Sequence, residues 1–322
     1  MCRDGDEPPR VHREELFVRV TVLGAGAMGC LFGGRLTGAG LDVVLVDAWP
    51  VHVDALNGTG LRVWEGDQVS FQAVRAVAAG APVRPAELVL LFVKSYRTEQ
   101  ALGQIPPLLA PGGVVLTLQN GLGAGELLAR QLGARRVLVG VTAQGATVLG
   151  PGEIRHGGAG ETLVGGVREV LPHAEKTAEV FSRAGLPTRV VADVAPALWK
   201  KLAVNCGINA LTALTGIKNG RIPELFEAAA LLRQAVREAA AVAAAAGVDL
   251  GDPDGLAATV LAIAKATGAN RSSMGQDVDR RSPTEIDFIN GAVVREGKRL
   301  GVATPVNETL LLLVKTLEAT FP

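Results

Sequence analysis

The feature that most constrains this chain is a glycine-rich loop set between an apolar run and a helical pattern. Residues 24–29 read GAGAMG, which matches G-x-G-x-x-G, and they directly follow the β-branched run at 18–23. A helical pattern over 27–37 comes next, and LDVVLVD at 41–47 forms a second apolar run. The string alone is common, but a strand, the loop, a helix and a second strand together predict a dinucleotide-binding βαβ unit.

Each glycine of this loop has a physical purpose in such a unit. Gly24 allows the tight turn, Gly26 lets a pyrophosphate approach the backbone, and Gly29 permits close packing of the helix. The helix N-terminus also favours the phosphate charge. The alternative is a tight strand–helix turn without a ligand. The expected cofactor contacts in the loop are Gly24, Ala25, Gly26, Ala27, Met28 and Gly29.

Three polar residues follow successive predicted strands. Asp47 ends the second strand, where a carboxylate accepts hydrogen bonds from a ribose 2′-hydroxyl and repels a 2′-phosphate, so it favours NAD. Lys94 follows LVLLFV and Asn120 follows VVLTL, at the sheet edge where ligands bind in such folds. The alternatives are a strand-end cap at Asp47, a solvated loop lysine at Lys94, and an Asn-Gly turn at Asn120.

The order of apolar runs and helical patterns predicts a two-part chain. Short strands alternate with helices, which indicates a mostly parallel sheet, and glycine-rich pieces over 145–167 are expected to be hairpin strands appended to it. Helices are predicted over 173–184, 195–214, 223–246, 256–267, 283–300 and 307–320. The predicted fold is an α/β Rossmann-type domain at 17–193 followed by an all-α domain at 194–322, with a disordered tail at 1–16.

Composition narrows the partners and the setting. Lysine plus arginine equals aspartate plus glutamate at 32 each, which argues against nucleic acid as the main partner. The three cysteines are scattered, and no cysteine or histidine pair has metal-site spacing. The charged N-terminal residues lack an apolar signal region, and the apolar run LVLLFV is too short to cross a bilayer. These observations predict a cytoplasmic protein without a metal site or a membrane association.

A polar stripe crosses the apolar helix predicted over 195–214. Lys201, Asn205 and Asn209 are four residues apart, so they lie on nearly one face, whereas Lys200 points about 100° away. Spacing alone leaves three possibilities open: a substrate-facing stripe, a buried and satisfied polar stripe, or a stripe on the helix surface.

Six segments match a known pattern in order and spacing. They are GAGAMG, VKS, QNGLG, WKKLAVNCGINALTALTGIKNGRI, SSMGQDVDRRSPTEIDFINGAVV and GVATPVNETL. From residue 17 onward the chain resembles the ketopantoate reductase family, the 2-dehydropantoate 2-reductases. The resemblance implies reduction of a 2-oxo acid with NADPH, on the route to pantothenate and coenzyme A.

The resemblance also implies roles for individual residues. It places a catalytic lysine at Lys201, which would act as general acid. It places substrate contacts at Asn120, Asn205, Asn209, Asn219 and Ser273. It places cofactor contacts at Lys94, Asn120 and the Gly145–Ala146 turn, and an acid near both the lysine and the cofactor at Glu285.

Local patterns offer other readings of two of these residues. Ser282, Pro283, Thr284 and Glu285 form a capping box with proline at the first helical position, which predicts a structural role for Glu285. Ser273 sits beside Ser272, and either serine suits a helix cap.

Two positions depart from the family pattern. Asp47 stands where the family commonly carries an arginine or another 2′-phosphate-binding group, so NAD competes with NADP as the expected cofactor. Gly275 stands where a larger apolar residue is expected, which predicts a looser substrate side. The alternatives to a 2-dehydropantoate 2-reductase are an NAD-dependent paralogue acting on another 2-oxo or hydroxy acid, and a cofactor-sensing protein without turnover. The expected assembly is a homodimer.

Overall fold

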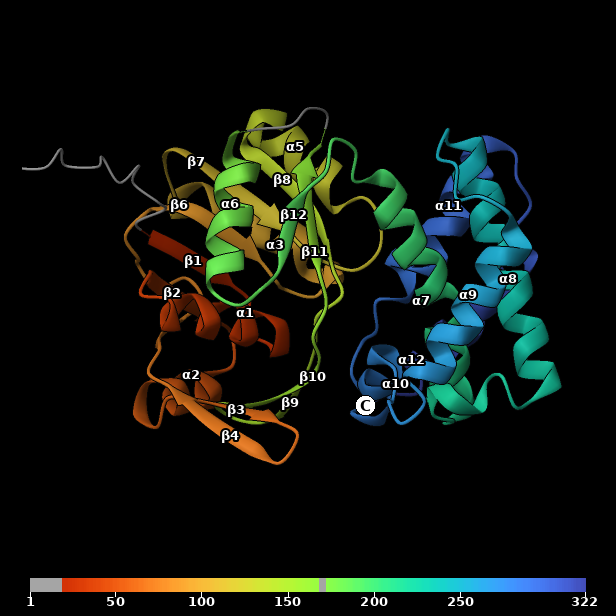
Figure 1. The fold of residues 1–322 in the computed structure, drawn as a ribbon, viewed down its shortest axis with the longest axis horizontal. Coiled ribbons are helices and arrows are strands. Elements are labelled where there is room, and N and C mark those ends of the chain that lie inside the picture. The colour runs from red at the N-terminus through yellow and green to blue at the C-terminus, as the bar shows by residue number, and fades with distance from the viewer. Residues whose placement is uncertain (1–18, 168–171) are drawn as a thin grey trace, which may run out of the picture.

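The computed structural model describes residues 19–167 and 172–322, in a strand-rich half followed by a helical half (Figure 1). The tail expected at 1–16 lies outside the described residues. The element order follows the sequence prediction closely: strands alternate with helices up to residue 190, and helices alone follow from residue 195. The chain is therefore an α/β Rossmann-type domain followed by an all-α domain.

A twisted eight-stranded sheet is the framework of the first half. Its order is β12-β11-β8-β7-β6-β1-β2-β5, and every neighbouring pair is parallel except β11 with β8. The strands are β1 (Arg19–Leu23), β2 (Asp42–Asp47), β5 (Arg75–Ala78), β6 (Ala86–Leu91), β7 (Leu109–Thr117), β8 (Val137–Thr142), β11 (Thr162–Gly166) and β12 (Thr188–Val190).

Helices cover both faces of this sheet, which explains why its central strands are apolar throughout. In β6, Leu88 and Leu90 belong to one core cluster, whereas Val89 and Leu91 belong to another on the opposite face. The covering elements are α1 (Ala27–Gly38), α2 (Pro50–Gly58), η1 (Ser95–Arg97), α3 (Thr98–Leu102), α4 (Ile105–Leu108), α5 (Ala124–Leu132), η2 (Ala134–Arg136) and α6 (Pro172–Arg183).

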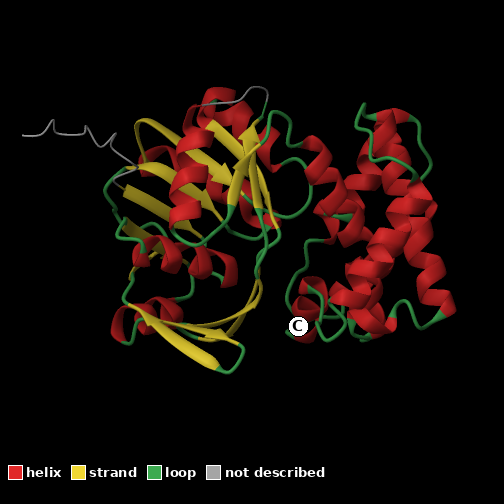
Figure 2. Ribbon diagram, viewed as in Figure 1, coloured by secondary structure: helices red, strands yellow, loops and turns green. Residues whose placement is uncertain are grey.

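A second, four-stranded sheet lies apart from the main one (Figure 2). Its order is β4-β3-β10-β9, with β3 (Leu61–Glu65), β4 (Gln68–Gln72), β9 (Gly145–Gly150) and β10 (Glu153–Gly158). The prediction that the hairpin strands of 145–167 extend the main sheet is therefore wrong for β9 and β10 and right only for β11. The reason is the β3–β4 hairpin, which offers β10 a parallel partner in β3.

The second half is built around the long helix α7 (Ala195–Thr215), which packs against most of the other helices. Gly207 lets α8 approach closely, since a Cβ there would lie 2.9 Å from Leu232. The remaining elements are η3 (Asn219–Arg221), α8 (Phe226–Ala245), α9 (Pro253–Ala266), α10 (Ser273–Asp279), η4 (Ile286–Phe288), α11 (Asn290–Leu300) and α12 (Pro305–Glu318). None of the helices among the described residues is long and apolar enough to span a membrane.

One predicted helix is interrupted. The helix expected over 283–300 is instead the short 3-10 turn η4 followed by α11, which begins at Asn290. Ile289 separates them with φ −103° and ψ −94°, outside the helical region. Glu285 directly precedes η4 and contacts Ser95 of the first half of the molecule.

Candidate active site

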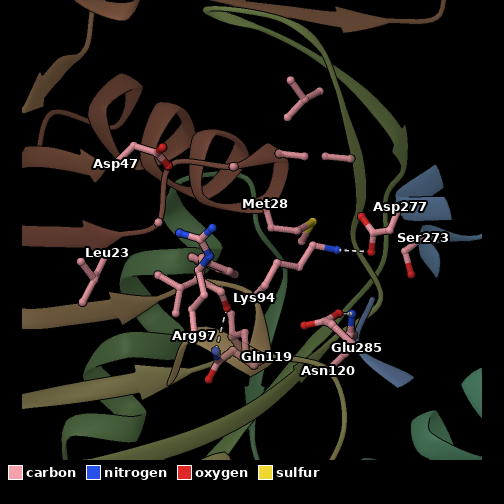
Figure 3. Close-up of a pocket in the computed structure, with 18 of the residues that line it drawn as sticks. Leu23, Met28, Asp47, Lys94, Arg97, Gln119, Asn120, Ser273, Asp277 and Glu285 are labelled. Atoms are coloured by element: carbon pink, nitrogen blue, oxygen red, sulfur yellow. Dashed lines mark hydrogen bonds and ion pairs between the residues drawn. The ribbon is translucent and has the colours of Figure 1, made fainter. Parts of the chain in front are cut away.

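A cavity of about 910 Å³ lies between the two halves, at the carboxyl ends of β1, β2 and β6. The first half contributes the glycine loop, Asp47, Lys94 and Asn120, and the second half contributes residues of α7, α10 and the segment before η4. Figure 3 shows Asp47 at one end of this space and Ser273, Asp277 and Glu285 at the other.

The glycine loop has the backbone geometry that a dinucleotide pyrophosphate requires. Gly24 has φ +101°, and a Cβ there would lie 2.5 Å from the backbone nitrogen of Val93. A Cβ on Gly29 would lie 1.9 Å from the Gly24 carbonyl oxygen, so both positions need glycine. Gly26 is exposed, with nothing within 4 Å of a Cβ built on it, so a ligand has room to approach its backbone.

Not every residue of the predicted loop set faces the cavity. Gly24, Gly26, Ala27 and Met28 line it. Ala25 is fully buried beneath the loop and Gly29 is packed under it, so these two shape the loop without lining the space.

Asp47 lines the far end of the cavity, as the sequence predicts for a ribose-binding carboxylate. Its Oδ1 also accepts a hydrogen bond of 2.9 Å from the Trp49 N–H, so the carboxylate both caps the end of β2 and faces the cavity. Trp49 and Arg97 line the cavity as well, and no role was predicted for either residue from the sequence.

Glu285 collects hydrogen bonds from two loops of the sheet domain. It is only 6% exposed, and its Oε1 accepts from the Ser95 N–H at 2.9 Å and from the Ser95 Oγ at 2.8 Å. Its Oε2 accepts from Asn120 Nδ2 at 3.1 Å. The capping-box interpretation is therefore wrong, because no helix begins at Ser282 and the carboxylate is used by donors far away in the sequence.

Lys94 crosses the cavity to the helical half. Its Nζ lies 2.6 Å from Asp277 Oδ2, so the alternative of a solvated loop lysine is wrong. Burial would lower the pKa of Lys94, but the carboxylates of Glu285 and Asp277 outweigh it and raise that pKa. Burial raises the pKa of Asp277, against the opposing pull of Lys94. We expect Lys94 to stay an ammonium, held between two acids.

Lys201 is the second lysine that faces the site. It lines the cavity from α7, and its Nζ donates a hydrogen bond of 3.1 Å to the carbonyl oxygen of Thr142, at the end of β8. Burial lowers the pKa of Lys201 to about 8, although the carboxylate of Glu285 opposes the shift. Lys200 is exposed and does not line the cavity, as the helical spacing predicts.

The predicted substrate residues divide into two groups. Asn205 and Ser273 line the cavity, and Ser272, not Ser273, is the cap of α10, since its Oγ accepts from the Gly275 N–H. Asn209 and Asn219 are buried at 6% and 7% exposure and do not line the cavity. Asn219 donates through Nδ2 to Thr267 Oγ1 at 3.0 Å, which ties it to the end of α9.

Gly275 does not loosen the substrate side, contrary to expectation. It is buried, and a Cβ there would lie 2.6 Å from the guanidinium carbon of Arg271. Arg271 pairs with Asp279 and donates to the carbonyl oxygens of Thr212 and Ile217. The missing side chain therefore makes room for an arginine that ties α10 to the end of α7.

No role was predicted for Ser95 or Asp277, although both lie inside segments that carry the family resemblance. Ser95 is the last residue of VKS, and Asp277 is four residues after Ser273 on α10, hence on the same helix face. Their partners Glu285 and Lys94 are distant in sequence, and local patterns carry no information about such pairs. Ala146, a predicted cofactor contact, does line the cavity at the start of β9.

The arrangement combines an anion-binding loop with a proton donor and a nearby carboxylate. A cationic amine with a pKa of about 8 can both stabilise negative charge on a carbonyl oxygen and transfer a proton to it near neutral pH. Among the described residues, no group of three or more His, Cys, Asp or Glu side chains is arranged to hold a metal ion.

Comparisons with known proteins agree with this geometry. A 2-dehydropantoate 2-reductase from Halobacterium salinarum is 38% identical over 303 residues, which cover 92% of this chain and 98% of that protein. The structure of a PanE/ApbA family ketopantoate reductase from Ralstonia eutropha is 38% identical with a TM-score of 0.86, covering 94% of this chain and 98% of that one. A D-mandelate dehydrogenase with NADH and anilino(oxo)acetate is 28% identical with a TM-score of 0.88, covering 94% and 99%.

Two family models cover most of the chain. The model described as ketopantoate reductase PanE/ApbA matches residues 20–169, and the model of its C-terminal part matches residues 193–318. The chain belongs to the ketopantoate reductase PanE/ApbA family.

Proposed function

We propose that this protein is a 2-dehydropantoate 2-reductase, which reduces 2-dehydropantoate to pantoate with NADH or NADPH and with Lys201 as general acid. The observation that carries the proposal is the position of Lys201, whose ammonium faces the same cavity as the glycine loop and has a pKa of about 8. The names of the relatives support the substrate.

The chain's own residues suit the binding of a dinucleotide. The exposed backbone of Gly26 and the N-terminus of α1 would hold the pyrophosphate, and Asp47 would hold the adenosine ribose. Lys94 and Asn120 line the cavity toward the helical half, where the nicotinamide end would lie. A reduced nicotinamide bound there supplies the hydride.

Lys201 would complete the reaction at the substrate oxygen. Addition of a hydride to the keto carbon breaks the C=O π bond and leaves negative charge on the oxygen. The ammonium stabilises that charge and donates its proton, so a hydroxyl forms and Lys201 becomes a neutral amine. Asn205 and Ser273 would bind the polar groups of the acid, because both face the cavity. Asn209 and Asn219 do not line the cavity, and we propose that they act on substrate binding indirectly, through the residues that do line it.

The pKa of Lys201 predicts the pH dependence of the reduction. Because the reduction needs the protonated amine, kcat/KM for the 2-oxo acid should be level below pH 8 and fall about tenfold per pH unit above it. Oxidation of the hydroxy acid needs the neutral amine, so its kcat/KM should rise over the same range. Steady-state rates at pH 6 to 10 in both directions check this, and a reduction rate that rises above pH 8 would contradict the assignment.

We infer that NADH is the preferred cofactor, because the Asp47 carboxylate on the cavity wall would repel a 2′-phosphate. The wild type should show kcat/KM for NADH at least about tenfold above that for NADPH, and Asp47→Asn should remove most of this preference. Asp54→Asn, at an exposed acid on α2 that does not line the cavity, is the matched control. Preference for NADPH that Arg97→Ala abolishes would contradict this inference and show that Arg97 binds the 2′-phosphate despite the carboxylate of Asp47.

The D-mandelate dehydrogenase likeness, together with Asp47, favours a second candidate function: an NAD-dependent enzyme acting on another 2-oxo or 2-hydroxy acid. A panel of 2-oxo acids that includes ketopantoate and phenylglyoxylate, each with NADH and NADPH, separates the two. The highest kcat/KM on ketopantoate supports the proposed function, and the highest on another acid supports the second candidate. Cofactor binding without turnover of any acid would indicate a sensing protein.

We infer a reducing, cytoplasmic setting from the cysteines. Cys30 and Cys206 are both free and buried, and burial raises the pKa of each thiol, to about 12 for Cys30. A homodimer stays a prediction. Light scattering measured on the protein as it elutes from a size-exclusion column would test it.

A further inference from the structure

Beneath the glycine loop lies a buried histidine that the chemistry above does not use. His52, on α2, is 1% exposed, and both of its ring nitrogens have partners. Nδ1 lies 3.0 Å from the backbone nitrogen of Gly152, in the turn between β9 and β10. Nε2 lies 2.9 Å from the carbonyl oxygen of Ala25, inside the glycine loop.

These partners fix where the ring proton lies. The Gly152 N–H can only donate, so Nδ1 must accept, and a neutral ring then carries its proton on Nε2. Nε2–H consequently donates to the Ala25 carbonyl oxygen. Cys30 Sγ also donates to this oxygen at 3.0 Å, but a thiol is the weaker donor.

The orientation of the Ala25 carbonyl sets the orientation of the next amide. None of the described peptide bonds is cis, and in a trans peptide the N–H points opposite to the C=O of the same unit. The Ala25 carbonyl is directed into the interior toward His52, so the N–H of Gly26 is directed away from it, toward the exposed side. Gly26 lines the cavity there, with free space around its α-carbon.

We propose that His52 is a positioning residue for the cofactor, holding the Ala25–Gly26 peptide so that the Gly26 N–H donates to the dinucleotide pyrophosphate. The proposal rests on the proposed function in that it requires a dinucleotide in this cavity. It also assigns a role to the second sheet, because the N–H of Gly152, in the turn between β9 and β10, donates a hydrogen bond to the histidine ring on the side opposite to the glycine loop. Because the acceptor is a charged phosphate oxygen, loss of the hydrogen bond from the Gly26 N–H should weaken the affinity for the dinucleotide about tenfold.

Two substitutions separate this role from a merely structural one. The amide nitrogen of glutamine lies as many bonds from the backbone as Nε2 of histidine, so His52→Gln keeps a donor for Ala25. Asparagine reaches only as far as Nδ1, so His52→Asn keeps the partner of Gly152 and loses the donor for Ala25. Cys30→Ala is the control for the second donor and should change affinity less than about twofold.

The test measures binding without turnover. By titration calorimetry, His52→Asn should raise the Kd of ADP-ribose, which contains the pyrophosphate, about tenfold. His52→Gln should stay within about twofold of the wild type, and the Kd of adenosine, which has no phosphate, should be unchanged in every variant. Thermal melts report separately on the fold.

Each other outcome overturns the proposal. Unchanged ADP-ribose affinity in His52→Asn, or equal losses in both variants, would show that the donor to Ala25 is not what matters. A parallel loss of adenosine affinity would place the effect at Trp49, whose ring stacks on His52 at 5.2 Å between centroids. If His52→Asn does not fold, loss of ADP-ribose affinity in His52→Gln still overturns it. If the wild type binds neither compound, the proposed function falls as well.

Discussion

Replacing Lys201 with alanine should lower kcat for reduction of the 2-oxo acid about a thousandfold, within the range that a general acid contributes. The loss should be in kcat, because the ammonium interacts most strongly with the charge that develops on the substrate oxygen during hydride transfer. The Kd of NADH should change by less than about threefold, since the proposed pyrophosphate and ribose contacts belong to the sheet domain. Single-turnover rates and NADH titration measure the two quantities separately.

The neighbouring lysine provides a matched control. Lys200→Ala removes the same side chain one position earlier on α7, where it is exposed and points away from the cavity. It should leave kcat and the Kd of NADH unchanged. Equal losses of kcat and NADH affinity in Lys201→Ala would mean that the lysine shapes the cavity and does not act on the substrate.

The fold was predictable where periodicity and glycine chemistry are strong. GAGAMG between two apolar runs predicts a βαβ unit. The structure shows why the glycines are needed, because Gly24 and Gly29 have no room for a Cβ. The β3–β4 hairpin was not predicted, since β4 is largely exposed and half of the residues in the two strands are polar, so they resemble surface loops in sequence. The placement of β9 and β10 depended on that hairpin and was wrong for the same reason.

The site was predictable where one helix carries it. Steps of four residues correctly place Lys201 and Asn205 on the cavity face of α7, whereas Asn209, one turn further on, is buried beyond the cavity. Glu285 shows the limit of local patterns. A capping box is a local pattern, but its acid is drawn to Ser95 and Asn120, about 190 and 165 residues away, by contacts that only the tertiary structure creates.

Glu285→Gln should have the second largest effect, and the effect should depend on pH. The glutamine amide oxygen can still accept from Ser95, and its amide nitrogen replaces the oxygen that accepts from Asn120, so the Asn120 amide has to turn its own oxygen toward it while the negative charge is lost. The carboxylate of Glu285 raises the pKa of Lys201 against burial, so its removal should move that pKa below 8. The decline of reduction kcat/KM with pH should therefore begin at lower pH than in the wild type.

The consequence is a rate loss that grows as the pH rises through the wild-type pKa. At pH 6 both enzymes hold a protonated Lys201, so the variant should lose little through this route, whereas at pH 9 it should be about tenfold slower. Glu285→Asp keeps the charge and should leave the pH at which the decline begins close to 8. If Glu285→Gln lowers the rate by the same factor at every pH, the carboxylate acts only by holding Ser95 and Asn120, and its charge does not tune the proton donor.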